Sequence, residues 1–320
     1  MTATTMDIDT DPRDARGQGA LGETIFRWLC LGAATLLLAA LAGVVISLAI
    51  GGWPAFRQFG LGFLTSTDWN PVTEVYGAAG PIVGTIVTSI LSLVIALPLA
   101  LGVSVFLVEF CPRNIAKPIA VAVELLAGIP SIVYGMWGLF VLAPWFALHV
   151  QLPIMTSTSL PGWVQAVFAG IPNGANIFTA SLILAIMILP YMAAVFRELL
   201  LTIPSQVREA AYGLGSTSFE VIRKVMLPYV KRGTVGVIML GLGRALGETM
   251  AVTFIIGNSH GFPHSLFDSG STIASTIANE FAEATSDMHT SALIALGFVL
   301  FVLTFAVLAV ARLLLASEKH

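Results

Sequence analysis

The chain has 320 residues, 57% of them hydrophobic and 10% charged, and its mean hydropathy is +0.90. Soluble domains carry about 25% charged residues, so this composition excludes an ordinary soluble protein and indicates an integral membrane protein. The net charge of −3 excludes little, because in a membrane protein the placement of charges is more informative than their sum.

The N-terminal residues are mostly polar and include Asp7, Asp9, Asp11 and Asp14. A segment with so little apolar content cannot fold alone, so we expect residues 1–25 to form a disordered cytoplasmic tail. A cleaved signal peptide is the alternative, because Ala40-Leu41-Ala42 resembles a cleavage site. The acidic start and the long apolar stretch that follows favour an uncleaved membrane span.

Six apolar windows are long enough to cross about 30 Å of hydrocarbon, which takes roughly 20 helical residues. They are residues 26–50, 82–108, 119–143, 177–199, 233–257 and 290–314. The sequence therefore predicts an all-α integral membrane protein with six transmembrane helices over residues 26–316. The third and fifth windows are less regular, because they contain charged residues.

The basic residues orient these six spans. If both termini are cytoplasmic, 13 of the 15 Lys and Arg residues lie on the cytoplasmic side, whereas Arg57 lies outside and Arg244 within the membrane. The positive-inside rule therefore predicts cytoplasmic termini. The outer loops carry six acidic residues against Arg57. Such a face does not attract free anions, so an anionic substrate would need a protein that delivers it.

The third window contains GIPSIVYG, residues 128–135. Pro130 removes a helical hydrogen bond and Gly128 loosens the same turn. This pattern predicts either a tolerated kink or a break that lines a passage, where freed backbone groups and Ser131 could meet water or substrate. Glu124, about one and a half turns earlier, either faces the bundle interior or lies near the inner interface.

The segment PSQVREAAYGLGSTSFEVIRKVMLP, residues 204–228, connects the fourth and fifth windows. Ser205 can begin a short helix that Gly213 and Gly215 end, and Thr217-x-x-Glu220 has the spacing of a capping box for a second helix. We expect Pro228 to end that second helix. Helix, glycine turn and helix form a compact hairpin, which is either a docking element or an ordinary solvated connector.

The fifth window contains GLGRALGETMAV, in which Arg244 and Glu248 are four residues apart and would share one helical face. A charge at the bilayer centre costs ~3 kcal/mol on insertion scales. One interpretation is a buried pair that neutralises itself and fixes helix packing. The other is a pathway site in which Arg244 binds an oxyanion, Glu248 competes for the guanidinium, and Thr249 adds a hydroxyl.

No GxxxxGK[ST] motif occurs, so this chain has no phosphate-binding loop of its own, and energy must come from partner proteins. We find no pair of a nucleophile and a base that would indicate an enzyme. Four histidines lie in or beside the outer loops without metal-ligand spacing, and we expect them at the surface: His149, His260, His264 and His289. We therefore expect no metal site and no cofactor bound by this chain.

The hairpin carries a longer pattern, namely Glu209-Ala210-Ala211, Gly215 after three residues, and Val225-x-Leu227-Pro228 after nine more. It resembles the EAA loop of ABC importer permeases, EAA-x3-G-x9-I-x-LP, and departs from it only at Val225. In that family the loop fits a cleft on a cytoplasmic ATPase subunit. The resemblance implies that Glu209 and Gly215 help to shape the loop and that its first helix carries force.

Three further motifs narrow the resemblance to phosphate-specific ABC importers, and most closely to their first membrane subunit (the PstC type). They are Tyr76-Gly-Ala-Ala-Gly-Pro81, GIPSIVYG and GRALGETMAV, and the resemblance covers residues 76–315. It implies a type I ABC importer bundle in the bacterial inner membrane, with Arg244, Glu248 and Thr249 on the phosphate pathway.

The same resemblance implies four kinds of partner. They are a second six-span permease subunit, two cytoplasmic ATPase subunits that use ATP and Mg, an extracytoplasmic phosphate-binding protein, and the lipid bilayer; nucleic acid is not among them. Three alternatives stay open. These are a permease for another oxyanion or small solute, the paralogous second permease subunit of the phosphate system, and an ion-coupled secondary transporter, which would need no ATPase dock.

Overall fold

The computed structural model of the chain describes residues 12–157 and 161–316, and it divides into two compact units at Ile50. The first unit contains the N-terminal part of helix α1, which spans Pro12–Phe59. The sequence predicts a disordered tail up to residue 25, whereas the structure is helical from Pro12. The Ala, Arg and Gln residues of this stretch favour that helix. Residues 1–11 lie outside the described part of the chain.

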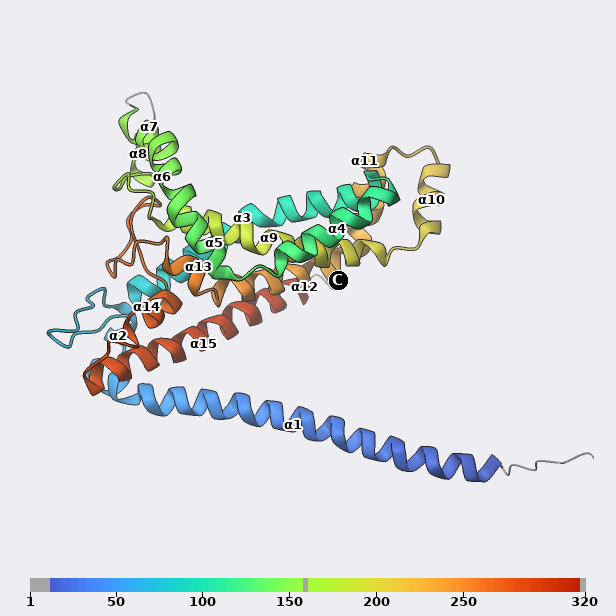
Figure 1. Cartoon of the computed structure of the whole chain (residues 1–320), viewed down its shortest axis with the longest axis horizontal. Helices are drawn as coiled ribbons and strands as arrows, with labels where there is room; N and C mark the ends of the chain where they lie inside the picture. Colours follow the sequence, from blue (N-terminus) through green and yellow to red (C-terminus); the bar gives the residue numbers. More distant parts are fainter. Residues whose placement is uncertain (1–11, 158–160, 317–320) are drawn as a thin grey trace, which may run out of the picture. The chain divides into compact units, whose positions relative to one another are not determined.

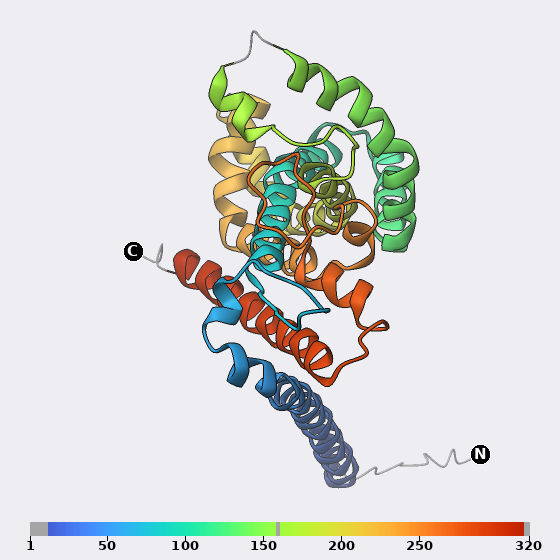
Figure 2. The ribbon, with the colours of Figure 1, turned by 90° about the vertical axis from the view of Figure 1, so that its left-hand side faces the viewer.

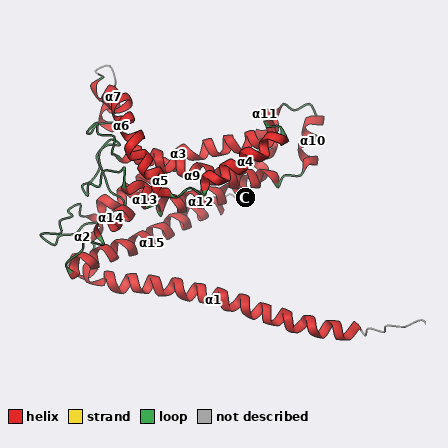
Figure 3. Ribbon diagram, viewed as in Figure 1, coloured by secondary structure: helices red, strands yellow, loops and turns green. Residues whose placement is uncertain are grey.

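The second unit is built almost entirely from helices, and Figure 3 draws no strand in it for residues 51–157 and 161–316. Figure 1 labels most of them. The helices are α2 (Gly62–Thr65), α3 (Ala79–Val105), α4 (Arg113–Ala127), α5 (Ser131–Trp137), α6 (Ala143–Phe146), α7 (Leu152–Thr156), α8 (Gly162–Val167), α9 (Ile177–Leu201), α10 (Ser205–Gly213), α11 (Ser218–Glu220), α12 (Leu227–Leu246), α13 (Met250–Thr253), α14 (Ile273–Glu280) and α15 (Asp287–Ala316).

Six helical stretches are long and apolar enough to cross a membrane, which confirms the predicted all-α membrane protein with six spans. They are Gly22–Phe59, Ala79–Phe110, Ser131–Thr156, Ile177–Leu201, Ser218–Leu246 and Asp287–Leu313. The first, second, fourth and sixth contain nearly all of the predicted windows. The third and fifth differ from the prediction, and both differences have a physical cause in the sequence.

The third window, residues 119–143, contains a break rather than a tolerated kink, which is the second of the two outcomes predicted from Gly128 and Pro130. Helix α4 ends at Ala127, Pro130 is extended with ψ 134°, and α5 begins at Ser131. The Tyr134 hydroxyl donates a hydrogen bond to the Leu126 carbonyl at 3.0 Å, so the break satisfies one of its own freed carbonyls. In Figure 1, α4 runs beside α9, and α5 to α7 then turn away from both.

The prediction of one helix over residues 233–257 is wrong, because α12 ends at Leu246 and three non-helical residues precede α13. At its other end the same helix is longer than expected. It continues from Ser218 through a π-helical turn, Val221–Met226, and passes Pro228 without a break. The π turn shifts the hydrogen-bond register just before Pro228, so the proline ring and its missing N–H are accommodated there.

Helix α9 is the centre of the second unit. Within its apolar window 67% of the residues are buried, against 28% or less in the other candidate spans. It packs against α3 through small residues such as Ala96 and Ala100, and against α12 and α13 through larger apolar side chains. The Ser104 hydroxyl donates to the Ala193 carbonyl at 2.8 Å and ties α3 to α9. Small residues and hydroxyls of this kind are how membrane helices approach closely.

The loop between α13 and α14 lies over the end of α3, as Figure 2 shows from that side. A Cβ added to Gly84 would lie 2.0 Å from the Ser271 carbonyl oxygen, and one added to Gly80 would lie 2.3 Å from that of His260. The Thr85 hydroxyl also accepts a hydrogen bond from the Ile273 N–H at 2.9 Å. Gly80, the second glycine of the Tyr76–Pro81 motif, is therefore explained by backbone contact with this loop.

Candidate functional site

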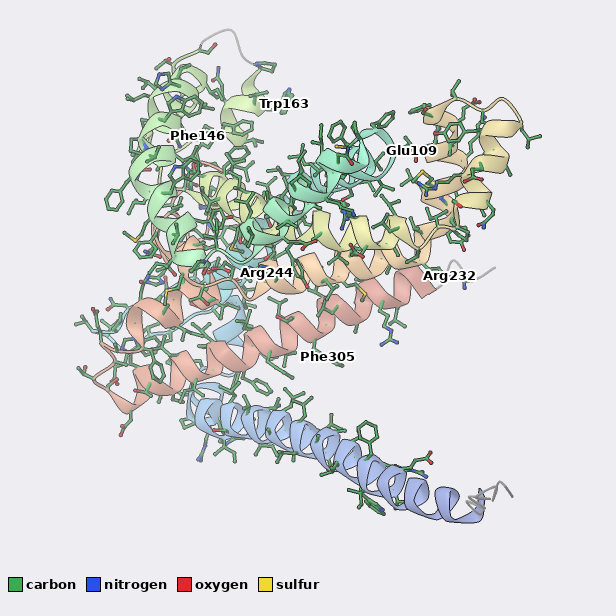
Figure 4. All side chains as sticks on the ribbon, turned by 45° about the vertical axis from the view of Figure 1, so that its right-hand side comes forward. Glu109, Phe146, Trp163, Arg232, Arg244 and Phe305 are labelled. Carbon is green, nitrogen blue, oxygen red and sulfur yellow. The ribbon has the colours of Figure 1, made fainter. Side chains whose placement is uncertain are left out.

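Arg244 lies in the last turn of α12, three residues before the break, and Figure 4 shows it and Arg232 towards opposite ends of that helix. Its guanidinium carbon is 5.3 Å from the ring centroid of Tyr191 on α9, which is a cation–π distance. Its Nε is buried without a hydrogen-bond partner. Arg244 as a whole is half-buried, but an unused donor on a buried nitrogen is unusual, because such groups are normally satisfied.

Glu248 does not form the predicted pair with Arg244, since no ion pair joins the two within residues 161–316. The helix has ended before Glu248, so the two side chains do not share a helical face. Instead the Glu248 carboxylate accepts a hydrogen bond from the Ala251 N–H at 3.2 Å, at the start of α13. The structural alternative, a self-neutralising pair that fixes helix packing, is therefore not what the structure contains.

Thr249 is the residue before α13, and its backbone carbonyl accepts a hydrogen bond from the Thr253 hydroxyl at 2.7 Å. Its own hydroxyl is 3.5 Å from the Gly247 carbonyl. Residues 247–249 thus expose polar backbone and side-chain groups directly after Arg244. A break of this kind is tolerated at membrane depth where it is buried in protein or lines a water-filled cavity.

The break at residues 128–130 precedes α5, which lies against the helix that follows the break at residues 247–249. Gly128 and Pro130 are exposed, and Ser131 is half-buried at the first position of α5. Gly135 of α5 packs on α13, because a Cβ there would lie 3.0 Å from the Ala251 Cα. The short helices that follow the two breaks therefore pack against each other. The structure bears out a discontinuity at these residues, while the passage they would line stays a prediction.

The predicted hairpin is present. Helix α10 begins at Ser205 and ends at Gly213, and Gly215 has φ +84°, a conformation that favours glycine. The capping box is also as predicted, because Thr217 accepts from the Glu220 N–H at 3.4 Å and Glu220 accepts from the Thr217 N–H at 3.1 Å. The sequence pattern predicted this local geometry correctly.

One side of the hairpin is packed and other residues of it are exposed. Val207 and Ala211 of α10, with Val225 of the π turn, pack on a buried cluster that includes Leu200 and Met226. This packing accounts for Ala211, the third residue of the EAA motif, and for the apolar side chain of Val225.

The opposite side of the hairpin carries the residues that the resemblance links to an ATPase. Glu209, Ala210 and Pro228 are exposed, and Leu227 is half-buried. Leu214 is 88% exposed and Phe219 is 68% exposed, although both are large apolar side chains. Exposed apolar groups on a projecting hairpin are typical of a docking surface, and the docking itself stays a prediction. The sequence analysis missed these two residues, and their position beside the glycine turn was the available indication.

A second contact of the hairpin was not predicted either. Glu109, at the end of the π-helical turn that extends α3, is 3.5 Å from Arg208 Nη1 and accepts a hydrogen bond from the Tyr212 hydroxyl. That hydrogen bond raises the pKa of Tyr212. Figure 4 shows Glu109 close to α10, so one carboxylate ties α10 to the end of α3. Glu124, which the sequence left unplaced, is 53% exposed and 3.8 Å from Arg197.

At the other end of the molecule, Glu280 connects four segments. It accepts hydrogen bonds from Trp69 Nε1 at 2.8 Å and from His289 Nε2 at 2.9 Å, and its other oxygen is 2.8 Å from His260 Nε2. The Tyr76 ring stacks on His289. Burial opposes ionisation of Glu280, but the hydrogen bonds from His260, Trp69 and His289 lower its pKa overall. His289 is only 6% exposed, so the prediction of a surface histidine is wrong there.

We expect Glu280→Gln to destabilise the protein at neutral pH by about 1–3 kcal/mol, because the amide cannot accept at both oxygens. The folded pKa is lowered, so the carboxylate contributes stability above its unfolded pKa and loses it as pH falls through the folded pKa. The melting temperatures of wild type and variant should therefore converge as the pH falls from the unfolded pKa of glutamate, about 4.3, through the lower folded pKa. Thermal unfolding in detergent from pH 7 downward measures this. Exposed Glu283→Gln is the control, and equal melting of both variants at pH 7 would contradict the prediction.

The histidine and acidic residues gather no metal site within residues 12–157 and 161–316, where no group of three or more His, Cys, Asp or Glu side chains could hold an ion. Cys30 and Cys111 are both free thiols. In the cluster around Glu280, the carboxylate is engaged by Trp69, His260 and His289, whereas the Tyr76 hydroxyl and His260 Nδ1 are buried without a hydrogen-bond partner among the described residues.

A family of transport proteins and individual relatives both match this chain over most of its length. The family described as "Binding-protein-dependent transport system inner membrane component" matches residues 97–319. The "Phosphate transport system permease protein PstC" of Mesorhizobium japonicum is 53% identical over 298 residues, which cover 92% of this chain and 90% of that protein. The protein of the same name from Haemophilus influenzae is 49% identical over 300 residues, covering 93% and 94%.

Two solved structures are similar in fold at low sequence identity. A chain of a bacterial ABC transporter involved in the import of the acidic polysaccharide alginate gives a TM-score of 0.56 at 17% identity, covering 92% of this chain and 99% of that one. A chain of the MetNI methionine ABC transporter in an inward-facing conformation gives 0.54 at 17% identity, covering 75% and 95%.

Proposed function

Because this chain belongs to the family of binding-protein-dependent transport system inner membrane components, we propose that it is a permease subunit of an ATP-driven importer of inorganic phosphate. The relatives that share about half of their residues with it carry the name of a phosphate transport permease. The substrate is therefore proposed from these relatives together with the chemistry of one side chain.

That side chain is Arg244, and its unpartnered buried Nε is the observation that carries the proposal. Arginine is always charged and offers a planar fork of N–H donors that matches phosphate oxygens. Tyr191 holds the guanidinium by its ring face, which leaves the N–H edge available to an anion. A phosphate that reaches this edge would satisfy a donor that the described chain leaves unused.

Glu248 and Thr249 complete the proposed pathway. Transport needs binding that is favourable but releasable. In this conformation Glu248 is engaged by the Ala251 N–H. A movement of the three-residue break would let its carboxylate compete for Arg244 and weaken the hold on phosphate. Gly128, Pro130 and Ser131 precede the α5 helix that packs on α13, and we propose that their break lines the same passage.

The hairpin of residues 204–228, which we call the coupling hairpin, connects this pathway to the energy source. Glu209, Ala210, Leu214 and Phe219 would face one of two cytoplasmic ATPase subunits, which bind ATP and Mg in place of this chain. A second six-span subunit would complete the pathway. This arrangement puts both termini of the chain in the cytoplasm, in agreement with the distribution of Lys and Arg. An extracytoplasmic binding protein would deliver the anion to the acidic outer face.

Two measurements test the proposal in cells that lack their own phosphate importer and express this chain together with the other subunits of its importer. The tagged chain, purified from membranes with mild detergent, should bring an ATPase and a second permease subunit with it. Radiolabelled phosphate should be taken up at least about tenfold faster than sulfate, because a pathway matched to one oxyanion discriminates by more than 1.4 kcal/mol. Equal uptake of both anions would contradict the phosphate assignment, and the absence of an ATPase would contradict the permease assignment.

A further inference from the structure

A cavity of about 260 Å³ lies beside the coupling hairpin, and no part of the proposed transport pathway uses it. Three cations from three helices line it, namely Lys117 of α4, Arg197 of α9 and Arg208 of α10. The rest of the lining is mainly apolar and includes Leu107, Ala116 and Leu201. A cavity that combines converging cations with apolar walls is suited to an amphiphilic or multivalent anion.

The cations keep donors available. Arg197 uses Nη1 for Glu198 at 2.6 Å, and Arg208 uses Nη1 for Glu109 at 3.5 Å. Each guanidinium has five N–H donors, and the described residues engage only Nη1 of each. Lys117 makes no hydrogen bond or ion pair within the part of the chain whose side chains are described. The cavity therefore has unused donors on all three basic residues.

Two of the three carboxylates near these cations are more exposed than the arginines. Glu124 and Glu198 are the carboxylates near Arg197, and they are 53% and 67% exposed, whereas the Arg197 side chain is only 20% exposed. Water and salt screen exposed charges far more than half-buried ones. Only Glu109 is as buried as the two arginines, and Tyr212 as well as Arg208 engages it, whereas Lys117 is itself exposed.

We propose that this cavity binds a phosphate group, carried either by an anionic phospholipid of the inner leaflet or by inorganic phosphate in the cytoplasm. The two arginine forks accept phosphate oxygens in pairs and Lys117 adds a mobile positive charge. The proposal rests on the proposed function only for the assignment of this side to the cytoplasm. There, basic pockets between membrane helices meet anionic headgroups.

Binding at this place would act on coupling. Arg208 belongs to α10, whereas Arg197 and Lys117 belong to helices of the bundle. A phosphate group that bridges the three residues joins the coupling helix to α9 and α4, beside the existing tie from Glu109 to Arg208 and Tyr212. Occupancy of the cavity therefore restricts how far α10 can move when the ATPase subunits move.

The chain contains a built-in reporter, because Cys111 lines the cavity as a free thiol. The intact importer with Cys30→Ser is placed in phosphatidylcholine nanodiscs, and alkylation of Cys111 by a water-soluble maleimide is followed by peptide mass spectrometry. One arm adds phosphatidylglycerol to the nanodisc, and the other adds inorganic phosphate to the buffer. Occupancy should slow the alkylation of Cys111 at least about threefold, since the reagent must enter the same space.

Protection by phosphatidylglycerol alone identifies the lipid as the source, and protection by inorganic phosphate alone identifies the free anion. Protection by both supports a site for the phosphate group itself. The control variant is Arg223→Gln, an exposed cation outside the cavity, which should behave as wild type. Lys117→Gln should raise the concentration needed for protection by about tenfold, the equivalent of one charged hydrogen bond.

Absence of protection in both arms, or equal protection in Lys117→Gln and wild type, would overturn the proposal. The readout needs no transport, so its failure leaves the assignment of phosphate import untouched. Conversely, a chain that failed to import phosphate could still show protection at Cys111, so the two failures are distinguishable.

Discussion

Replacing Arg244 with glutamine abolishes phosphate uptake while the protein still reaches the membrane. Glutamine keeps two amide donors but loses the charge, and each hydrogen bond to a charged group contributes about 1.5–3 kcal/mol. With two such bonds lost in the low dielectric of the membrane, uptake should fall at least about 100-fold. Radiolabelled phosphate uptake, normalised to the amount of protein in the membrane fraction, measures the effect.

Two controls separate binding from folding in this experiment. Arg232→Gln lies on the same helix and is exposed, so uptake by this variant should stay within about twofold of wild type. Tyr191→Phe keeps the ring that holds Arg244 and should retain most activity, whereas Tyr191→Leu removes the cation–π contact. Uptake by Arg244→Gln at more than half the wild-type rate would show that Arg244 does not bind phosphate on the pathway.

The charge exchange, Arg244→Glu with Glu248→Arg, adds a further test. A self-neutralising pair would tolerate the exchange, but the two groups make no ion pair within residues 161–316. We therefore expect the exchanged protein to be as inactive as Arg244→Gln, because the guanidinium is moved away from Tyr191 and beyond the end of α12. Recovery of uptake would favour the structural interpretation after all.

Gly215→Pro should uncouple the chain from its ATPase subunits without preventing insertion into the membrane. Gly215 has φ +84°, whereas proline is restricted to about −65°. The substitution also removes the hydrogen bond that the Gly215 N–H donates to the Tyr212 carbonyl at 2.9 Å. The hairpin can accommodate proline only by changing its turn, which displaces α10 from the position that the ATPase would meet.

Co-purification of the ATPase with the tagged chain measures this coupling, and we expect at least a tenfold loss, about 1.4 kcal/mol of association free energy. Gly213→Ala is the matched control, because Gly213 ends α10 in helical conformation and a Cβ there meets no atom within 4 Å. Glu209→Ala should show a smaller loss, since Glu209 is exposed and its contacts would come from the partner. Unchanged co-purification with Gly215→Pro would exclude the hairpin as the docking element.

Hydropathy and spacing predicted the number of spans, the coupling hairpin and its capping box. These features depend on residues close together in sequence, such as Thr217 and Glu220, whose hydrogen bonds form within one turn. The break at residues 128–130 was also visible, because proline and glycine act on the backbone at their own positions. Local chemistry was therefore sufficient for these parts of the fold.

The sequence did not predict features that depend on distant residues. An i, i+4 spacing predicts a shared helical face only if the helix continues, and α12 ends between Arg244 and Glu248. Tyr191 is 53 positions from Arg244 in the chain, and nothing in its neighbourhood distinguishes it from other aromatic residues of a membrane span. The cluster around Glu280 likewise joins four segments, so no single window contained it.

The continuous helix from Ser218 to Leu246 has the length of a lever arm. Its 29 residues extend for about 43 Å at 1.5 Å per residue, with the coupling hairpin at one end and Arg244 near the other. A tilt of about 5° around one end displaces the other by roughly 4 Å, more than the length of a hydrogen bond. Under the proposed function, an ATPase that rocked the hairpin by a few degrees would make or break contacts at Arg244, so large domain movements would not be required for each transport step.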